Sequence, residues 1–175
     1  MYRVLCLILF LAFVLLASDV LMFPTEAVVN VPSTTTSAST TIASNIEEQV
    51  LAAINRVRED NHLAPLSVAK DLTSVARLHS QDMATRDYFS HVTPEGDTMR
   101  KRVLRFGITN WNLLAENIAM NYGHLDPAGV AVKGWLNSQG HRHNILDHDL
   151  TETGIGVAID AKGRIFLTQL FARRK

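Results

Sequence analysis

The sequence predicts a mixed α/β domain with a small antiparallel sheet, and three observations support this prediction. Apolar residues recur at helical spacing through the first half of the chain. Strand-like apolar stretches with flanking turn residues follow after position 110. The resulting order, helices first, one strand in the middle and two strands at the end, is typical of a mixed α/β domain with a small antiparallel sheet.

The first predicted helix begins close to Ser44, because Ser44 and Glu47 have the spacing of a capping box. It is expected to end near Asn61, before Pro65. One face of this helix is apolar and carries Ile46, Val50, Ile54 and Val57.

Two more helices are predicted before the first strand. The second follows Ser67, and its buried stripe is expected to contain Leu72, Val75, Ala76, His79 and Met83. The third and shorter one runs from about Thr98 to Phe106 and stops at Gly107. It contains a basic run over residues 100–105, which is expected to be a solvated face.

The second half of the domain is predicted to hold three strands and a fourth helix. The segment LLAENIAMNY, residues 113–122, reads as a buried strand. The fourth helix opens at Asp126-Pro127 and runs through Trp135, and Gly140 is expected to break it. Strands over residues 154–160 and 164–172 then form a hairpin, and the basic residues 173–175 are expected to be a solvated tail.

The segments before this domain predict export. Arg3 precedes an apolar run over residues 4–17, the length of a signal-peptide core, and residues 20–23 extend it to marginal spanning length. Residues 1–27 are therefore expected to be either a cleaved signal peptide or an N-terminal membrane anchor. Residues 28–45, rich in Ser and Thr, are expected to be a flexible linker to a domain over residues 46–175. The domain would then be extracytoplasmic, either secreted or tethered by residues 1–23.

Composition excludes several classes of function. The chain has 17 basic and 17 acidic residues, so it lacks the excess of Lys and Arg that neutralises nucleic-acid phosphates. Its single cysteine, Cys6, lies inside the apolar segment. The exported part therefore has no disulfide, no catalytic thiol and no cysteine ligand for zinc.

Glu116 is the residue that points to chemistry. It shares the alternating face of its strand with Leu114, Ile118 and Met120. A carboxylate on an apolar face costs several kcal/mol if it is unpaired, so Glu116 is expected either to take up a proton or to meet a cationic or metal partner.

The histidines supply candidate partners for Glu116. His91 lies in a loop after the second helix, and His141 lies two residues before His143, a spacing at which helical side chains diverge. A His141–His143 metal pair is therefore disfavoured. His79 lies on the apolar stripe of its helix and is expected to be a hydrogen-bonded core residue.

Four stretches of the chain, in order and spacing, resemble the CAP superfamily, also called the SCP domain. They are VARLHSQDMATRDYFSHVTPEG, LLAENIA, VKGWLNSQGHRHNIL and TGIGVAIDAKGRIFLTQLFA. This superfamily includes cysteine-rich secretory proteins, antigen 5 venom allergens and plant pathogenesis-related proteins. The resemblance covers residues 46–172 and is greatest to a short, cysteine-free bacterial branch. It implies an α-β-α sandwich, with a small antiparallel sheet between helical layers and a central cleft.

The resemblance also implies a site. The family's cleft holds two histidines and two glutamates, and its motifs match His91, Glu116 and His141 in this chain. The second glutamate would fall at Ser138, so it is missing here. The resemblance thus implies that Glu116 meets His91 and His141, and that the two histidines hold zinc or another divalent metal ion.

Three interpretations of function stay open at this point. The first is a binding module that uses the His/Glu cleft to hold a lipid, peptide or cell-envelope ligand, with or without a divalent metal. The second is a metal-assisted hydrolase or protease in which Glu116 is the general base on a water held by His91 and His141. The third is a structural extracytoplasmic domain with a vestigial cleft. The loss of a second carboxylate at Ser138 favours binding over catalysis.

Overall fold

The computed structural model describes residues 34–175 of the chain, with side chains from residue 38 onward. The proposed signal or anchor segment, residues 1–27, and residues 28–33 of the expected linker lie outside the described residues. The described elements, in chain order, are α1 (Thr34–Asp60), β1 (Ser67–Val68), α2 (Lys70–Arg86), α3 (Met99–Arg105), β2 (Trp111–Tyr122), α4 (Pro127–Asn137), α5 (Gln139–Leu146), β3 (Glu152–Ile159) and β4 (Arg164–Arg174). In this part of the chain, no helix combines the length and apolar character needed to cross a membrane.

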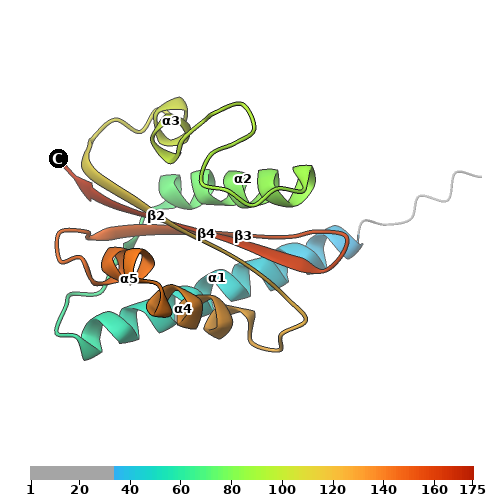
Figure 1. Cartoon of the computed structure of the whole chain (residues 1–175), viewed down its shortest axis with the longest axis horizontal. Coiled ribbons are helices and arrows are strands. Elements are labelled where there is room, and N and C mark those ends of the chain that lie inside the picture. The colour runs from blue at the N-terminus through green and yellow to red at the C-terminus, as the bar shows by residue number, and fades with distance from the viewer. Residues whose placement is uncertain (1–33) are drawn as a thin grey trace, which may run out of the picture. The chain divides into compact units, whose positions relative to one another are not determined.

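These elements form three layers. Helices α2 and α3 cover one face of the sheet, and α1, α4 and α5 cover the other (Figure 1). The strand order is β1-β3-β4-β2, and β4 pairs antiparallel with both of its neighbours. The predicted α-β-α sandwich is confirmed. The sheet itself is mixed rather than purely antiparallel, because the two-residue strand β1 runs parallel to β3.

Helix α1 begins earlier than the sequence predicted. Its apolar face is buried as expected, with Ile46, Val50 and Ile54 in the main core. The prediction of a flexible linker is wrong over residues 34–45, since the helix starts at Thr34. Core contact accounts for only part of the difference, because Ala43 packs against the core whereas residues 38–42 of the helix are exposed.

A buried arginine, Arg58, fixes the other end of α1. Its side chain donates to the carbonyls of Ala64, Ile145, Asp147 and Leu150 at 2.8–3.1 Å. Burial, as the largest cause, lowers the pKa of Arg58 from its ordinary value, and the nearby Asp147 charge opposes this. These bonds tie α1 to the chain that follows α5.

Two glycines let α2 lie directly on β3. A Cβ added at Gly154 would meet the backbone of Leu72 at 2.2 Å, and one added at Gly156 would meet the backbone of Arg77 at 2.1 Å. Helix α2 presents the predicted stripe to this surface, including Leu72, Val75 and Met83. The close approach therefore depends on the absence of side chains on β3.

A separate helix, α5, follows α4, and the sequence did not predict it. The break falls at Ser138, not at Gly140, and α5 follows at once. Asn144 on α5 donates to the side-chain oxygen of Asn117 at 2.9 Å, and Asn117 donates to the carbonyl of His141 at 3.3 Å. These bonds fix α5, and with it His141, against β2.

The prediction that the basic residues 173–175 form a solvated tail is also wrong for Arg173 and Arg174. Arg174 belongs to β4 and bonds Asp71 and Glu152, each at 2.8 Å, and Arg173 pairs with Asp149. The ion pairs join the end of β4 to the start of α2 and to β3.

Candidate functional site

Glu116 lies on β2 with its side chain only 3% exposed. One carboxylate oxygen, Oε1, is 2.8 Å from Nδ1 of His91, and the other, Oε2, is 2.5 Å from Nη2 of Arg102. An ionised carboxylate can only accept hydrogen bonds, so Nδ1 of His91 carries the hydrogen of this pair. The structure therefore brings Glu116 and His91 together and gives Glu116 the cationic partner that its burial required.

That partner, Arg102, was missed in the sequence. The basic run of residues 100–105 was expected to be solvated, but the Arg102 side chain is only 11% exposed. Helix α3 turns this residue towards β2, whereas Arg105 remains exposed and pairs with Asp97. The sequence showed that Glu116 needed a cation, but it did not distinguish one arginine of the run from another.

His91 and His141 come from opposite sides of the sheet and meet beside β2. His91 follows α2, and its side chain is 50% exposed. His141 lies on α5, and the centroids of the two rings are 6.3 Å apart. Burial and, to a smaller degree, the neighbouring His91 lower the pKa of His141. His143 is exposed on the same helix, so the two histidines of α5 form no pair around one ion.

The two secondary residues have structural positions. His79 is buried, and its Nε2 is 3.1 Å from the carbonyl oxygen of Ser90, so it is the hydrogen-bonded core residue predicted. Burial first, and then the charge of Arg102, lower its pKa. Ser138 lies at the junction of α4 and α5 and makes no capping hydrogen bond with its side chain.

The imidazole nitrogens of His91 and His141 are of the kind that binds a divalent metal ion. The two rings, however, lie too far apart to share one in this arrangement. With Nδ1 of His91 held by a carboxylate, its Nε2 is the nitrogen left to ligate, the arrangement typical of zinc-binding histidines. Two imidazoles that share a tetrahedral zinc ion, with Zn–N of about 2.0–2.1 Å, would place their centroids about 5 Å apart. The observed 6.3 Å is about 1 Å longer, so the rings would have to move closer to share an ion.

A different group has three possible metal ligands within reach of one another. Among the described residues, the ligand atoms of Asp147, His148 and Asp149 lie within 4.8 Å of one another. His148 is exposed, however, and Asp149 already pairs with Arg173. This group could hold a metal ion by its geometry, but an exposed acidic cluster is common without one.

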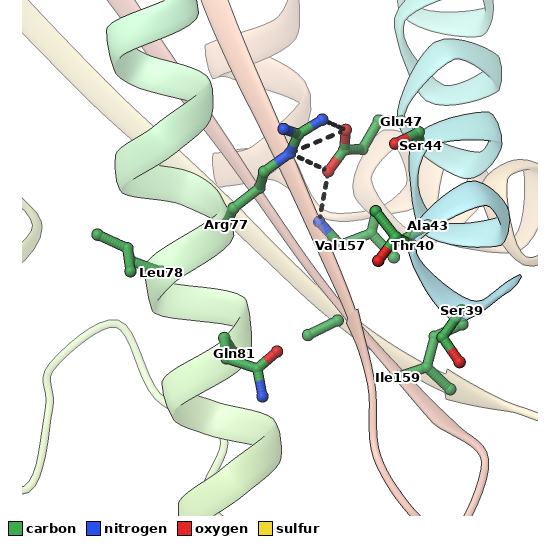
Figure 2. Close-up of a pocket in the computed structure, with 11 residues that line it drawn as sticks. Ser39, Thr40, Ala43, Ser44, Glu47, Arg77, Leu78, Gln81, Val157 and Ile159 are labelled. Carbon is green, nitrogen blue, oxygen red and sulfur yellow. Dashed lines mark hydrogen bonds and ion pairs between the residues drawn. The ribbon is translucent and has the colours of Figure 1, made fainter. Parts of the chain in front are cut away.

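Two cavities lie on either side of α2. One of about 540 Å³ lies between α1 and α2 beside β3, and Figure 2 shows that the Glu47–Arg77 ion pair joins the two helices at one end of it. Glu47 also accepts a hydrogen bond from the backbone nitrogen of Val157 at 3.1 Å, at the edge of β3 that β1 leaves uncovered. A second cavity of about 400 Å³ lies between α2 and α3, and His79 and Arg102 form part of its wall.

Comparison with known proteins gives a consistent result. The sequence model of the cysteine-rich secretory protein family, CAP, matches residues 51–171. A Bacillus subtilis (strain 168) protein, described as the uncharacterized membrane protein YlbC, is 39% identical over 133 residues, which are 76% of this chain and 36% of the relative. The uncharacterized protein YkwD of the same organism is 38% identical over 124 residues, which are 71% of this chain and 46% of the relative.

A solved structure shows the same relationship in three dimensions. An extracellular protein with an SCP domain from Bacillus anthracis has a TM-score of 0.66 and 36% sequence identity, over 79% of this chain and 43% of that one. This chain thus spans less than half the length of each of these three relatives. What the rest of each relative does is therefore not carried over to this chain.

Proposed function

Because the chain belongs to the cysteine-rich secretory protein (CAP) family, we propose that it is an extracytoplasmic binding module. In this proposal the surface formed by His91 and His141 holds a divalent metal ion, zinc by its ligand chemistry. This surface then takes a lipid, peptide or cell-envelope ligand. The names of two relatives, one extracellular and one a membrane protein, support a location outside the cytoplasm. Residues 1–23 would either be cleaved or tether the domain.

One observation carries the proposal, namely that Glu116 holds His91 in an exposed position. The carboxylate is buried and bonds Nδ1, while half of the imidazole side chain is open to solvent. A ring held in this way offers Nε2 as a fixed ligand atom. The lowered pKa of His141 keeps that ring neutral at pH 7, as metal binding requires.

Binding is favoured over hydrolysis by the same contacts. A general base must reach the water from which it takes a proton. Both oxygens of Glu116 are bonded, one to His91 and one to Arg102. The position where the family carries a second glutamate is Ser138, which has no carboxylate.

The first experiment is a zinc titration of the purified protein by calorimetry at pH 7.5. We expect saturable binding of one ion, weakened about 10-fold or more in His91→Ala and in His141→Ala, because each substitution removes one ligand. Circular dichroism and thermal unfolding show whether both variants remain folded.

Two matched variants serve as controls. His143→Ala removes an exposed histidine from the same helix as His141 and is expected to leave the affinity unchanged. His148→Ala tests the group around Asp147. Absence of saturable binding, or binding lost only in His148→Ala, would contradict the proposed site.

A further inference from the structure

We infer that Arg102 is a positioning residue that sets the orientation of the His91 ring through Glu116. This inference concerns a residue outside the His/Glu set that the family resemblance implies, and its bearing on metal binding rests on the proposed function. Arg102 touches neither the exposed ring of His91 nor His141 in any contact described above. Its action is therefore indirect.

The contacts of Arg102 show how it would act. Nη2 bonds Oε2 of Glu116 at 2.5 Å, and Nη1 bonds the carbonyl oxygen of His91 at 2.8 Å and that of Asp97 at 3.1 Å. One planar guanidinium thus holds both the carboxylate that contacts the His91 ring and the backbone from which that ring projects. Glu116 and the backbone of His91 are fixed relative to each other by the same group.

The remaining nitrogen of Arg102, Nε, is buried and has no hydrogen-bond partner among the described residues. The position of the guanidinium is therefore fixed by its three acceptors, Glu116 and the carbonyls of His91 and Asp97.

This arrangement determines which ring nitrogen of His91 carries the hydrogen. A charged Glu116 accepts from Nδ1 and so leaves the Nε2 lone pair facing outward. An isolated neutral histidine in water favours the opposite form, with the hydrogen on Nε2. Arg102, which holds both Glu116 and the backbone of His91, therefore keeps His91 in the form that can bind a metal ion through Nε2.

The test measures this form directly, in the metal-free protein. Imidazole ¹⁵N chemical shifts, recorded at a fixed pH of 8, report the share of His91 with the hydrogen on Nδ1. We expect this form to dominate in the wild type and to fall clearly in Arg102→Gln, where the charge opposite Glu116 is lost. Arg102→Lys keeps the charge but cannot hold three acceptors in the same plane, so an intermediate share is expected.

The matched control is Arg105→Gln. Arg105 lies on the same helix, is exposed and pairs with Asp97 without contacting Glu116, so its loss should leave His91 unchanged. If zinc binds as proposed, Arg102→Gln should also weaken it by about 10–100-fold, the usual effect of removing a residue that orients a metal ligand.

The two proposals can fail separately. A wild-type protein that binds no zinc contradicts the proposed function but leaves the ring-nitrogen measurement intact. Folded Arg102→Gln with an unchanged share of the Nδ1–H form would overturn the inference. Should Arg102→Gln fail to fold, an unchanged share in Arg102→Lys would overturn it equally.

Discussion

At the candidate site, the charged side chain of Glu116 fixes the orientation of the neutral ring of His91. Glu116 is buried and bonded at both oxygens, so its charge orients His91 instead of meeting solvent. His79 is a buried residue of α2, and it lines the same cavity as Arg102. Burial, and after it the charge of Arg102, lower the pKa of His79 and make protonation of its ring unfavourable.

Because His79 is buried, we expect the protein to become less stable as the pH falls from 7 to 5. Burial lowers the pKa of the folded ring below its ordinary 6.5, and His141 is shifted in the same direction. Below about pH 6.5 the unfolded chain binds a proton that the folded ring does not, so acid favours unfolding. Above that pH both states are neutral and the effect vanishes. Urea unfolding at pH 7 and at pH 5 measures the difference.

The variant His79→Gln tests how much of this pH dependence comes from His79. The variant is expected to lose less stability between pH 7 and pH 5 than the wild type does. His124→Gln, at an exposed loop position, is expected to keep the wild-type loss. An equal loss in His79→Gln and in the wild type would show that His79 is not the source.

At the scale of elements, the distance between α2 and β3 is set by glycine. We expect Gly156→Ala to lower the free energy of unfolding by about 3 kcal/mol, because its Cβ would lie 2.1 Å from the backbone nitrogen of Arg77. Neither backbone can move without disturbing the sheet or the helix. Chemical denaturation measures the change.

Gly134 provides the comparison. A Cβ added at Gly134, on α4, meets nothing within 4 Å, so Gly134→Ala should raise stability by about 0.5–1 kcal/mol through helix propensity. Similar effects at the two glycines would mean that contact with α2 does not decide the result at Gly156.

The elements also show what the sequence could predict. Helices α2 and α4 and the strands β2, β3 and β4 each bury one side or run through the core, and this leaves a readable apolar period. Helix α3 buries only Val103 and was predicted from its end signals, Thr98 and Gly107. Helix α5 buries only Ile145 fully, so its polar sequence has no such period. Strand β1 has two residues, both exposed, and no pattern at all. The first turns of α1 are rich in Ser and Thr, and residues 38–42 are exposed, so they have no apolar period either.

The candidate site, too, could be predicted only in part from the sequence. Glu116 stood out because a charged residue interrupts an apolar face, and the family resemblance pointed to His91 and His141. The ion pair with Arg102 depends on how α3 packs against β2. This packing is a tertiary property that neighbouring residues in the chain do not encode.

For the molecule as a whole, the edge of β3 that β1 leaves without a pairing strand predicts a role for Glu47 in keeping copies apart. Beyond Thr153, β1 no longer covers this strand, and Glu47 with Arg77 closes the opening (Figure 2). We expect Glu47→Ala to cost about 1–3 kcal/mol of stability, since Val157 and Arg77 lose their acceptor. Unpaired strand edges also join to one another, so light scattering should show association that grows with concentration.

Glu48→Ala is the control for this variant. Glu48 is the next residue of α1 and is exposed, so its loss should change neither stability nor association. A Glu47→Ala protein that stays monodisperse at all concentrations would show that the helices alone protect the edge.

The strand order has a consequence for the time at which the site forms. Both β2, which carries Glu116, and β3 come earlier in the chain than β4, yet each is held in the sheet mainly by β4. During synthesis, β2 therefore waits for β4, its only partner strand among the described elements, until residues 164–174 have emerged. His91, Arg102 and Glu116 are all made early, but they are brought into register only when that late segment closes the sheet.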